Sequence, residues 1–405
     1  MSLTSIAIQN FKSFKDVRVN LGNLNILIGA NASGKSNFIQ MFTFMRDIIA
    51  NGLDNAISVQ GGPDFITNAH KISDTLSFEF TSDDDGFIPF AGRDKRDDLD
   101  ILSTTYQCSL AFAIAGQPPQ STESLSEDCL PRRSDTQEHA TVTLSGANGR
   151  YRLDGRSQDG TSLPMEGTYL GMFVELIERG NRLLLEQSLA KGVFPPAMRI
   201  RSLMVYDIDP KEPKKAASIV GKNDLEPDAS NLAIVLHRIL RDPAQKRKFF
   251  NILNDLLPFI DELDTQPFID RSMFFKIRER YAPELYIPAS LMSDGTINLI
   301  ALIVILYFES APLVIIEEPE RNVHPFLVSK IVSMLRDASK EKQIIISTHN
   351  PEIVRHANLD ELLLVSRDEQ GYSNISRASN MDSVRQFLQD DVGIEELYVQ
   401  DLLGV

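Results

Sequence analysis

The sequence predicts an α/β fold in which short buried strands alternate with helices. Three observations support this prediction. A glycine-rich loop, GANASGKS at residues 29–36, lies between an apolar run and a helical pattern. Residues 294–365 alternate between helical and strand patterns, which favours a sheet covered by helices. Residues 3–20 and 76–144 contain strand-like segments with turn signals, which predicts an antiparallel β-subdomain beside a mixed sheet.

Composition excludes several classes of protein. The 405 residues are 42% hydrophobic and 24% charged, which is ordinary for a globular chain of two or three domains and not for a disordered or fibrous one. The net charge of -15 argues against a nucleic-acid binder that uses its whole surface. Two cysteines cannot form a disulfide framework. The longest apolar run, residues 299–308, is shorter than the roughly 20 residues of a membrane span, so we expect a cytoplasmic protein.

The N-terminal part predicts a strand, a turn and a second strand, followed by a buried strand and a helix. Ile6, Ile8, Val17 and Val19 alternate with polar residues, and Leu24–Ile28 is a short, mostly apolar run that suggests a buried strand. A helix is expected from about Ser36 to Ala50. Further strand-like segments occupy residues 76–80, 105–115 and 141–144.

The middle of the chain is less regular. Residues 82–100 and 116–138 are weakly apolar, so we expect loops or mobile insertions there. The pair Asn148-Gly149 predicts a hairpin. A helix is expected from about 168 to 190, and residues 229–262 predict helices that are interrupted at prolines.

The C-terminal part predicts a regular alternation of elements. We expect a helix at 294–309, a strand at 312–317, a helix at 325–339, and strands at 343–347 and 361–365.

The loop at residues 29–36 matches the pattern G-x-x-x-x-G-K-[ST] in the strand–loop–helix context that it requires. Glycines let the backbone approach phosphate, and the N–H groups at the start of the helix face the anion. Lys35 adds a positive charge near the terminal phosphates, and Ser36 offers a hydroxyl to Mg²⁺. The alternative is a glycine-rich turn with a surface lysine.

A second motif, LVIIEEPE, covers residues 313–320. Its four apolar residues predict a buried strand that delivers two acids at its end. The order of the acids suggests that Glu317 holds Mg²⁺ and that Glu318 is the general base. His349 follows the next apolar strand and could bond the γ-phosphate or the attacking water. The alternatives are solvated acids and a structural histidine.

The order of four motifs resembles the ATP-binding-cassette (ABC) ATPases. GANASGKS is followed by LMSDGT at 291–296, IIEEPE at 315–320 and STHNP at 347–351. The resemblance is greatest to the RecF/SMC branch, which includes the ATPase half of overcoming-lysogenization-defect (OLD) nucleases. IQNFKSF at 8–14, DASNL at 228–232 and His324-Pro325 also resemble that branch.

This resemblance implies an ABC-type P-loop ATPase head with a mixed sheet, an antiparallel β-subdomain and a helical lobe. It implies that ATP is bound by the loop and by residues near the adenosine: Lys12, Ser13, Phe14, Gly29, Asn31, Ala32, Ser33, Gly34, Lys35, Ser36 and Asn37. Ser293 and Gly295 would close over the ATP of the opposite subunit. Ser36 and Glu317 would hold Mg²⁺, Glu318 would be the base, and His349 would be the switch histidine.

Two positions depart from the family pattern, and the position of the family's Q-loop glutamine is open. Glu317 stands where cassette ATPases usually carry Asp. Asp294 replaces the first glycine of the LSGGQ sequence of transporters, which argues against a transporter subunit. Gln60 is a weak candidate for the Q-loop glutamine, and a polar loop residue is the alternative.

We expect four parts along the chain. These are an N-terminal ATPase part at 1–115, an insertion at 116–195, a helical lobe at 196–285 and a C-terminal ATPase part at 286–405. We expect no Toprim nuclease domain and no long coiled coil. Asp207 and Asp209 are interpreted as structural.

The expected function is Mg²⁺-dependent ATP hydrolysis by a homodimer, or a higher oligomer, that closes head-to-tail around ATP. It would drive or regulate a DNA-repair or anti-phage defence assembly with a separately encoded effector or nuclease. One alternative is a scaffold that holds ATP without appreciable turnover and sequesters its effector. Another is an ATP-gated DNA clamp, which would use the local basic clusters Lys246–Lys248 and Lys276–Arg280, although solvated surfaces would explain these equally.

Overall fold

The computed structural model describes most of the chain in two compact units. The described residues are 2–70, 72–83, 86–88, 98–112, 119–131, 139–163, 165, 168, 174, 183–186, 195–219, 224–268 and 271–381. The predicted helix at 168–190 falls almost entirely outside them. The first unit consists of Met1–Gly22, Ala30–Leu203 and Val365–Arg377, and the second of Asn23–Gly29, Met204–Leu364 and Ala378–Val405.

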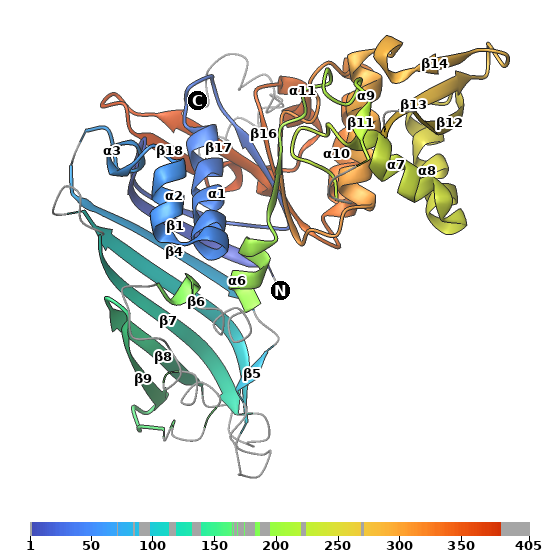
Figure 1. The fold of residues 1–405 in the computed structure, drawn as a ribbon. Coiled ribbons are helices and arrows are strands. Elements are labelled where there is room, and N and C mark those ends of the chain that lie inside the picture. The colour runs from blue at the N-terminus through green and yellow to red at the C-terminus, as the bar shows by residue number, and fades with distance from the viewer. Residues whose placement is uncertain are drawn as a thin grey trace. The chain divides into compact units, whose positions relative to one another are not determined.

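The first unit contains a large antiparallel sheet with the strand order β2-β1-β4-β6-β7-β8-β9, and β5 pairs with β6. Figure 1 shows the long strands β4, β6 and β7 side by side. The predicted hairpin is confirmed: Asn148 and Gly149 join β8 to β9, both with positive φ. The strands are β1 (Leu3–Phe11), β2 (Phe14–Asn20), β4 (Thr75–Asp83), β5 (Phe87–Ile88), β6 (Leu99–Ala111), β7 (Gln120–Pro131), β8 (Ala140–Ala147) and β9 (Arg150–Ser157).

The prediction of a loop at 116–138 is wrong, because β7 occupies Gln120–Pro131 in the centre of this sheet. The inward positions of β7 include Glu123 and Glu127, which are both buried, so hydropathy does not reveal the alternation. The other predicted loop, 82–100, likewise contains β5 and the beginning of β6.

Buried Glu123 ties β7 to a segment far away in the sequence. Its carboxylate accepts hydrogen bonds from the hydroxyls of Tyr106 and Tyr151, the latter at 2.6 Å, and from the backbone N of Leu184. Glu186 in the same short 3-10 helix, η2 (Leu184–Glu186), accepts from the backbone N of Leu53 at 2.9 Å. Burial raises the pKa of Glu123 to about 7, although the three hydrogen bonds oppose the shift.

Helices of the first unit pack on the β1–β2 end of the sheet. Phe38 of α1 lies edge-on to Phe14, and Phe44 of α1 lies 6.2 Å from Phe11 between ring centroids. Figure 1 shows α1 and α2 beside each other there. The helices are α1 (Lys35–Asn51), α2 (Leu53–Val59), α3 (Pro63–Ile66) and α6 (Pro195–Arg201).

The second unit is built on parallel strands in the order β10-β15-β16-β3-β17. Strands β3 and β16 are buried along their whole length, as their apolar runs predict. β18 is the neighbour of β17 in the strand order. The bounds are β3 (Leu24–Ile28), β10 (Met204–Tyr206), β15 (Leu313–Glu317), β16 (Gln343–Thr348) and β17 (Leu362–Arg367). Strand β18 (Ser373–Arg377) belongs to the first unit.

Helices of the second unit complete its hydrophobic core. Every residue of α9 from Ile297 to Leu306 is buried, because this helix is apolar on all sides. The predicted elements of this region are confirmed within two residues at each end. The helices are α9 (Asp294–Tyr307), α10 (Pro325–Ala338) and α11 (Pro351–His356), with short 3-10 turns η3 (Ala289–Leu291), η4 (Leu359–Glu361) and η5 (Ala378–Asn380).

The predicted helical lobe is only partly helical. Helices α7 (Leu232–Arg241) and α8 (Pro243–Leu256) are confirmed, and Asp242 caps α8 by accepting from two backbone N–H groups. The same part of the chain also contains a four-stranded antiparallel sheet that the sequence analysis does not predict. Its strands are β11 (Ala217–Ser218), β12 (Ile260–Pro267), β13 (Ser272–Glu279) and β14 (Tyr286–Pro288).

Candidate functional site

Three of the predicted motifs emerge at one edge of the parallel sheet. In the register of the strands, Glu317 of β15 is level with Ser347 of β16, and Thr348 is level with Ile28 of β3. The carboxyl ends of these neighbouring strands therefore bring together the start of the phosphate loop, the acidic pair and His349. This edge is where parallel sheets usually bind ligands.

The phosphate loop has the backbone of an anion site. Ala32 has a φ of 62° and Gly34 a φ of 121°, and α1 begins at Lys35 directly after them. The loop is closed by a hydrogen bond from Ser33 N to Ala30 O at 3.2 Å. Lys35 Nζ lies back on its own loop and donates to Ala30 O at 2.9 Å.

The residues of this loop fit a bound phosphate with Mg²⁺. Asn31, Ala32 and Ser36 are exposed, so the Ser36 hydroxyl is accessible to a metal ion. Gly34 is the N-cap of α1, so the N-terminus of this helix, a favourable place for an anion, begins directly after the loop.

A cavity of about 310 Å³ lies beside the loop, within the first unit. Lys12, Ser13 and Asn37 line it, together with His70 and Arg367. Asn37 Nδ2 donates to Ser13 Oγ at 2.8 Å, so these two predicted residues are brought together. The volume is at the lower end of the range typical of small-molecule sites.

Lys12, Gln60 and Phe14 have packing or bonding partners of their own. Lys12 Nζ donates to Oε1 of Gln40 and, at 2.8 Å, to Oε1 of Gln60. Burial lowers the pKa of Lys12. The ring of Phe14 is fully buried against Phe38 and is not among the residues that line the cavity. The structure therefore gives Phe14 a packing role, and Gln60 a role in holding Lys12.

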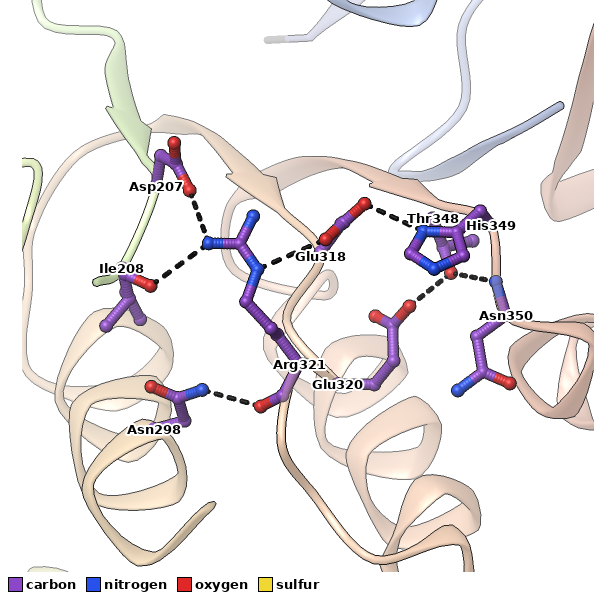
Figure 2. A network of polar contacts seen from close by, with 9 residues as sticks. All are labelled: Asp207, Ile208, Asn298, Glu318, Glu320, Arg321, Thr348, His349 and Asn350. Carbon is purple, nitrogen blue, oxygen red and sulfur yellow. Dashed lines mark hydrogen bonds and ion pairs between the residues drawn. The ribbon is translucent and has the colours of Figure 1, made fainter. Parts of the chain in front are cut away.

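Glu318 forms the centre of a polar network in the second unit (Figure 2). Its Oε1 lies 2.7 Å from Nδ1 of His349, and its Oε2 accepts from Nε of Arg321 at 3.1 Å. Its backbone φ of 45° lies in the left-handed region, which is rare for a glutamate and is typical of functional sites. Burial is the largest single effect on the pKa of Glu318 and raises it. The hydrogen bonds from Arg321 and His349 together outweigh burial and hold this pKa below its usual value.

A second acid lies behind this pair. Glu320 is buried, and its Oε1 accepts from the hydroxyl of Thr348, whereas its Oε2 has no hydrogen-bond partner. The same Thr348 hydroxyl accepts from Asn350 N at 2.9 Å. Burial raises the pKa of Glu320, and its hydrogen bond from Thr348 joins the acidic motif to the His349 strand.

Ser293 and Gly295 lie at the start of α9. Ser293 is its N-cap, and the Ser293 Oγ accepts from Thr296 N at 3.2 Å. A Cβ on Gly295 would lie 2.4 Å from the backbone O of Asn322, so this glycine is required by close packing. The neighbouring Asp294 is held by Lys214.

The basic clusters are partly neutralised within the second unit. Arg278 pairs with Asp261 at 2.8 Å and with Glu262 at 3.0 Å, and Lys276 lies 3.6 Å from Asp264. These pairs reduce the charge that the β12–β13 surface could offer to a phosphate backbone.

The sequence analysis missed Arg321, Glu320 and Asn298 as members of the site. It interpreted Asp207 as structural, and Asp207 indeed holds Arg321 at 3.0 Å. Asp207 directly follows β10, a strand parallel to β15, so it emerges at the same sheet edge as Glu318. The sequence gives no signal for this, because β10 is not among the predicted strands.

Two family comparisons match separate stretches of the chain. Residues 1–141 match the family described as "AAA ATPase domain", and residues 218–355 match "AAA domain, putative AbiEii toxin, Type IV TA system". The phosphate loop lies within the first match, and Ser293, Glu318 and His349 lie within the second. These matches confirm the resemblance to ATPases that the motifs indicate.

Two curated proteins are similar over shorter stretches. Septu protein PtuA of Bacillus thuringiensis is 27% identical over 90 residues, which are 21% of this chain and 23% of that protein. Endonuclease GajA of Bacillus cereus (strain VD045) is 40% identical over 47 residues, which are 12% of this chain and 8% of that protein. The chain thus spans less than a quarter of the length of either relative.

Solved structures with similar folds include two heads of SMC proteins. The structure described as "SmcHead bound to the C-winged helix domain of ScpA" has a TM-score of 0.48 at 14% identity, covering 93% of this chain and 98% of that one. The SMC head domain from Thermotoga maritima has a TM-score of 0.43 at 13% identity, covering 93% and 99%. Within the described part of this chain, no helix combines the length and the apolar character needed to cross a membrane.

Proposed function

We propose that this chain, which matches AAA-family ATPase domains in two stretches, is an Mg²⁺-dependent ATP hydrolase of the cytoplasm. The observation that carries this proposal is the pairing of Glu318 with His349 at the sheet edge from which the phosphate loop starts. A carboxylate next to a histidine at such an edge can orient and deprotonate a water molecule.

The main predicted residues have distinct roles in this proposal. The loop residues Lys35 and Ser36 hold the phosphates and Mg²⁺, and Glu317 is the second metal ligand. Mg²⁺ would neutralise charge that develops on the phosphate oxygens. Glu318 acts as the base, and His349 orients it through the 2.7 Å contact. The cavity beside Lys12 and Ser13 takes the nucleoside.

We further propose that two chains close head-to-tail around ATP. Ser293 lies at the N-terminus of α9, a second place where backbone N–H groups can face an anion. Because each chain already has its own phosphate loop, this second position is useful across a dimer. The output would be the assembly or release of a separately encoded effector in DNA repair or anti-phage defence.

The decisive experiment measures phosphate release from ATP with and without Mg²⁺. The Lys35→Ala variant should lose both ATP binding and turnover, because it lacks the charge that faces the phosphates. Tight ATP binding by Lys35→Ala in calorimetry would contradict the proposed site. Turnover that persists without divalent cations would contradict the role of the metal.

A scaffold that holds ATP without appreciable turnover is a second candidate. Both carboxylate oxygens of Glu318 are engaged and its pKa is lowered, which makes it a weaker base. In this case the wild type and the Glu318→Gln variant would bind ATP with the same affinity, and neither would release phosphate. A DNA clamp is less favoured because carboxylates already pair with Lys276 and Arg278.

A further inference from the structure

The guanidinium of Arg321 joins two strand ends in the second unit. Its Nε donates to Glu318 Oε2 at 3.1 Å, while its Nη1 donates to Asp207 Oδ1 at 3.0 Å and to Ile208 O at 3.4 Å. Asp207 follows β10 and Glu318 follows β15, which are parallel neighbours. Figure 2 shows Arg321 lying between the two acids. The Arg321 side chain thus links the proposed base, Glu318, to an acid at the end of the neighbouring strand β10.

The backbone of Arg321 is fixed as well. Asn298 of α9 donates from Nδ2 to Arg321 O at 2.6 Å. Arg321 N in turn donates to Glu318 O at 2.9 Å, which closes the turn between them. The next residue, Asn322, has a φ of 63°, and its carbonyl lies against Gly295 of α9. Arg321 is therefore anchored at its carbonyl, at its amide and at two points on its guanidinium.

We propose that Arg321 is a positioning residue that fixes the Glu318 carboxylate for attack on the nucleotide. This inference rests on the proposed function. A planar guanidinium suits the task, because its donors have fixed directions and can satisfy two acceptors at once. Glu318 has an unusual backbone conformation, so its side chain needs an external constraint to hold one orientation. His349 constrains the other oxygen of the same carboxylate.

The chain offers a matched control. Arg336 donates from Nε to Glu361 Oε1 at 2.7 Å and from Nη2 to the backbone O of His356 at 3.2 Å. Its side chain is 39% exposed, against 37% for Arg321. Both arginines hold a glutamate and a backbone carbonyl; Arg321 also pairs with Asp207, whereas Arg336 holds both oxygens of Glu361 away from the acidic motif. Arg336→Ala removes a comparable ion pair without touching Glu318.

The test compares Arg321→Ala, Asp207→Asn and Arg336→Ala in steady-state ATP hydrolysis. Arg321→Ala should reduce kcat by about 10- to 100-fold, the usual cost of a misplaced catalytic group. Its ATP affinity, measured by calorimetry in the Glu318→Gln background, should equal that of Glu318→Gln alone. Asp207→Asn should reduce kcat less, and Arg336→Ala should retain the turnover of the wild type.

Chemical rescue separates positioning from folding. Ethylguanidinium should restore part of the turnover of Arg321→Ala and none of that of Lys35→Ala, because only the first variant has a cavity shaped for that group. If Arg321→Ala does not fold, Asp207→Asn provides the same comparison with an isosteric change. Unchanged or increased kcat in a folded Arg321→Ala protein would overturn this inference alone. A wild-type protein without turnover would overturn the proposed function, and this inference with it.

Discussion

Ser373 lies so close to Gly34 that a Cβ atom on Gly34 would come within 2.2 Å of Ser373 Oγ. The same Ser373 hydroxyl donates to Ser33 O at 2.6 Å and shares a hydrogen bond with Ser13 Oγ at 2.8 Å. The Ser373 side chain, on β18, therefore contacts the phosphate loop and supports it. Gly34 also has a φ of 121°, so two independent reasons require glycine there.

We expect Gly34→Ala to abolish ATP binding and to destabilise the protein by about 1–3 kcal/mol, because both the backbone and Ser373 must shift. Calorimetric titration with ATP and chemical denaturation measure the two effects. Gly160→Ala is the control, since Gly160 has a φ of 85° and no atom within 4 Å of an added Cβ. It should bind ATP normally. Normal ATP binding by Gly34→Ala would show that the loop adapts.

The two acids of the LVIIEEPE motif should have separable roles. Glu318→Gln should bind ATP and Mg²⁺ normally while its turnover falls by about 10²–10⁴-fold, the usual contribution of a positioned base. Glu317→Gln should instead raise the Mg²⁺ concentration needed for half-maximal turnover. Titration of Mg²⁺ at saturating ATP distinguishes the variants, and an exchange of the two phenotypes would reverse the assignment.

Ser293→Arg tests the head-to-tail dimer. The variant should bind ATP almost normally within one chain but should not close, because the added bulk enters the gap next to the phosphates. Ser293→Ala controls for the lost N-cap, which is worth about 1 kcal/mol of stability.

A mixing experiment makes this test sharper. In a heterodimer of Ser293→Arg and Lys35→Ala chains, both lesions fall on the same composite site, and the other site is intact. The mixture should regain turnover that neither variant shows alone, provided that one closed site can act. Full activity of homogeneous Ser293→Arg would rule out the role of Ser293 in the partner's site.

Stability should depend on pH through Glu123. Its pKa is about 7 in the folded protein and about 4.5 in the unfolded chain. Because the folded pKa is raised, Glu123 makes its full contribution to the free energy of unfolding below pH 4.5. This contribution, about 3 kcal/mol in total, is lost as the pH rises through 7. Tyr106, Tyr151, Cys108 and Glu186 are the titratable groups that face it.

Glu123→Gln keeps the size of the side chain and removes this titration. The free energy of unfolding, measured from pH 4.5 to 8, should therefore fall less steeply in the variant than in the wild type. If the free energy of unfolding fell equally with pH in the two proteins, groups other than Glu123 would cause the pH dependence.

The elements that sequence predicts well are those with a local signal. The phosphate loop follows the fully buried, mostly apolar strand β3 and leads through Gly34 into α1, so one short window specifies strand, loop and helix. The same holds for Glu317 and Glu318 at the end of β15. In each case the residues that determine the element are adjacent along the chain.

The parts that sequence does not predict depend on distant partners. β7 was missed because its inward positions carry Glu123 and Glu127, which are buried only once the neighbouring strands supply partners. The bond between Arg321 and Asp207 joins residues 114 positions apart, and no local pattern reports it. Hydropathy records how polar a side chain is, not whether a partner will satisfy it.

Strand β3 has a consequence for how the chain is made. Asn25 on β3 and Ile345 on β16 are paired neighbours although they lie 320 positions apart. On the ribosome, this strand therefore remains without β16 until residues 343–348 have been synthesised. Pairing over such a separation is slow and leaves apolar surface exposed to aggregation and to chaperones. A chain released before residue 343 has no β16 with which to pair β3, so it cannot complete the sheet edge from which its phosphate loop starts.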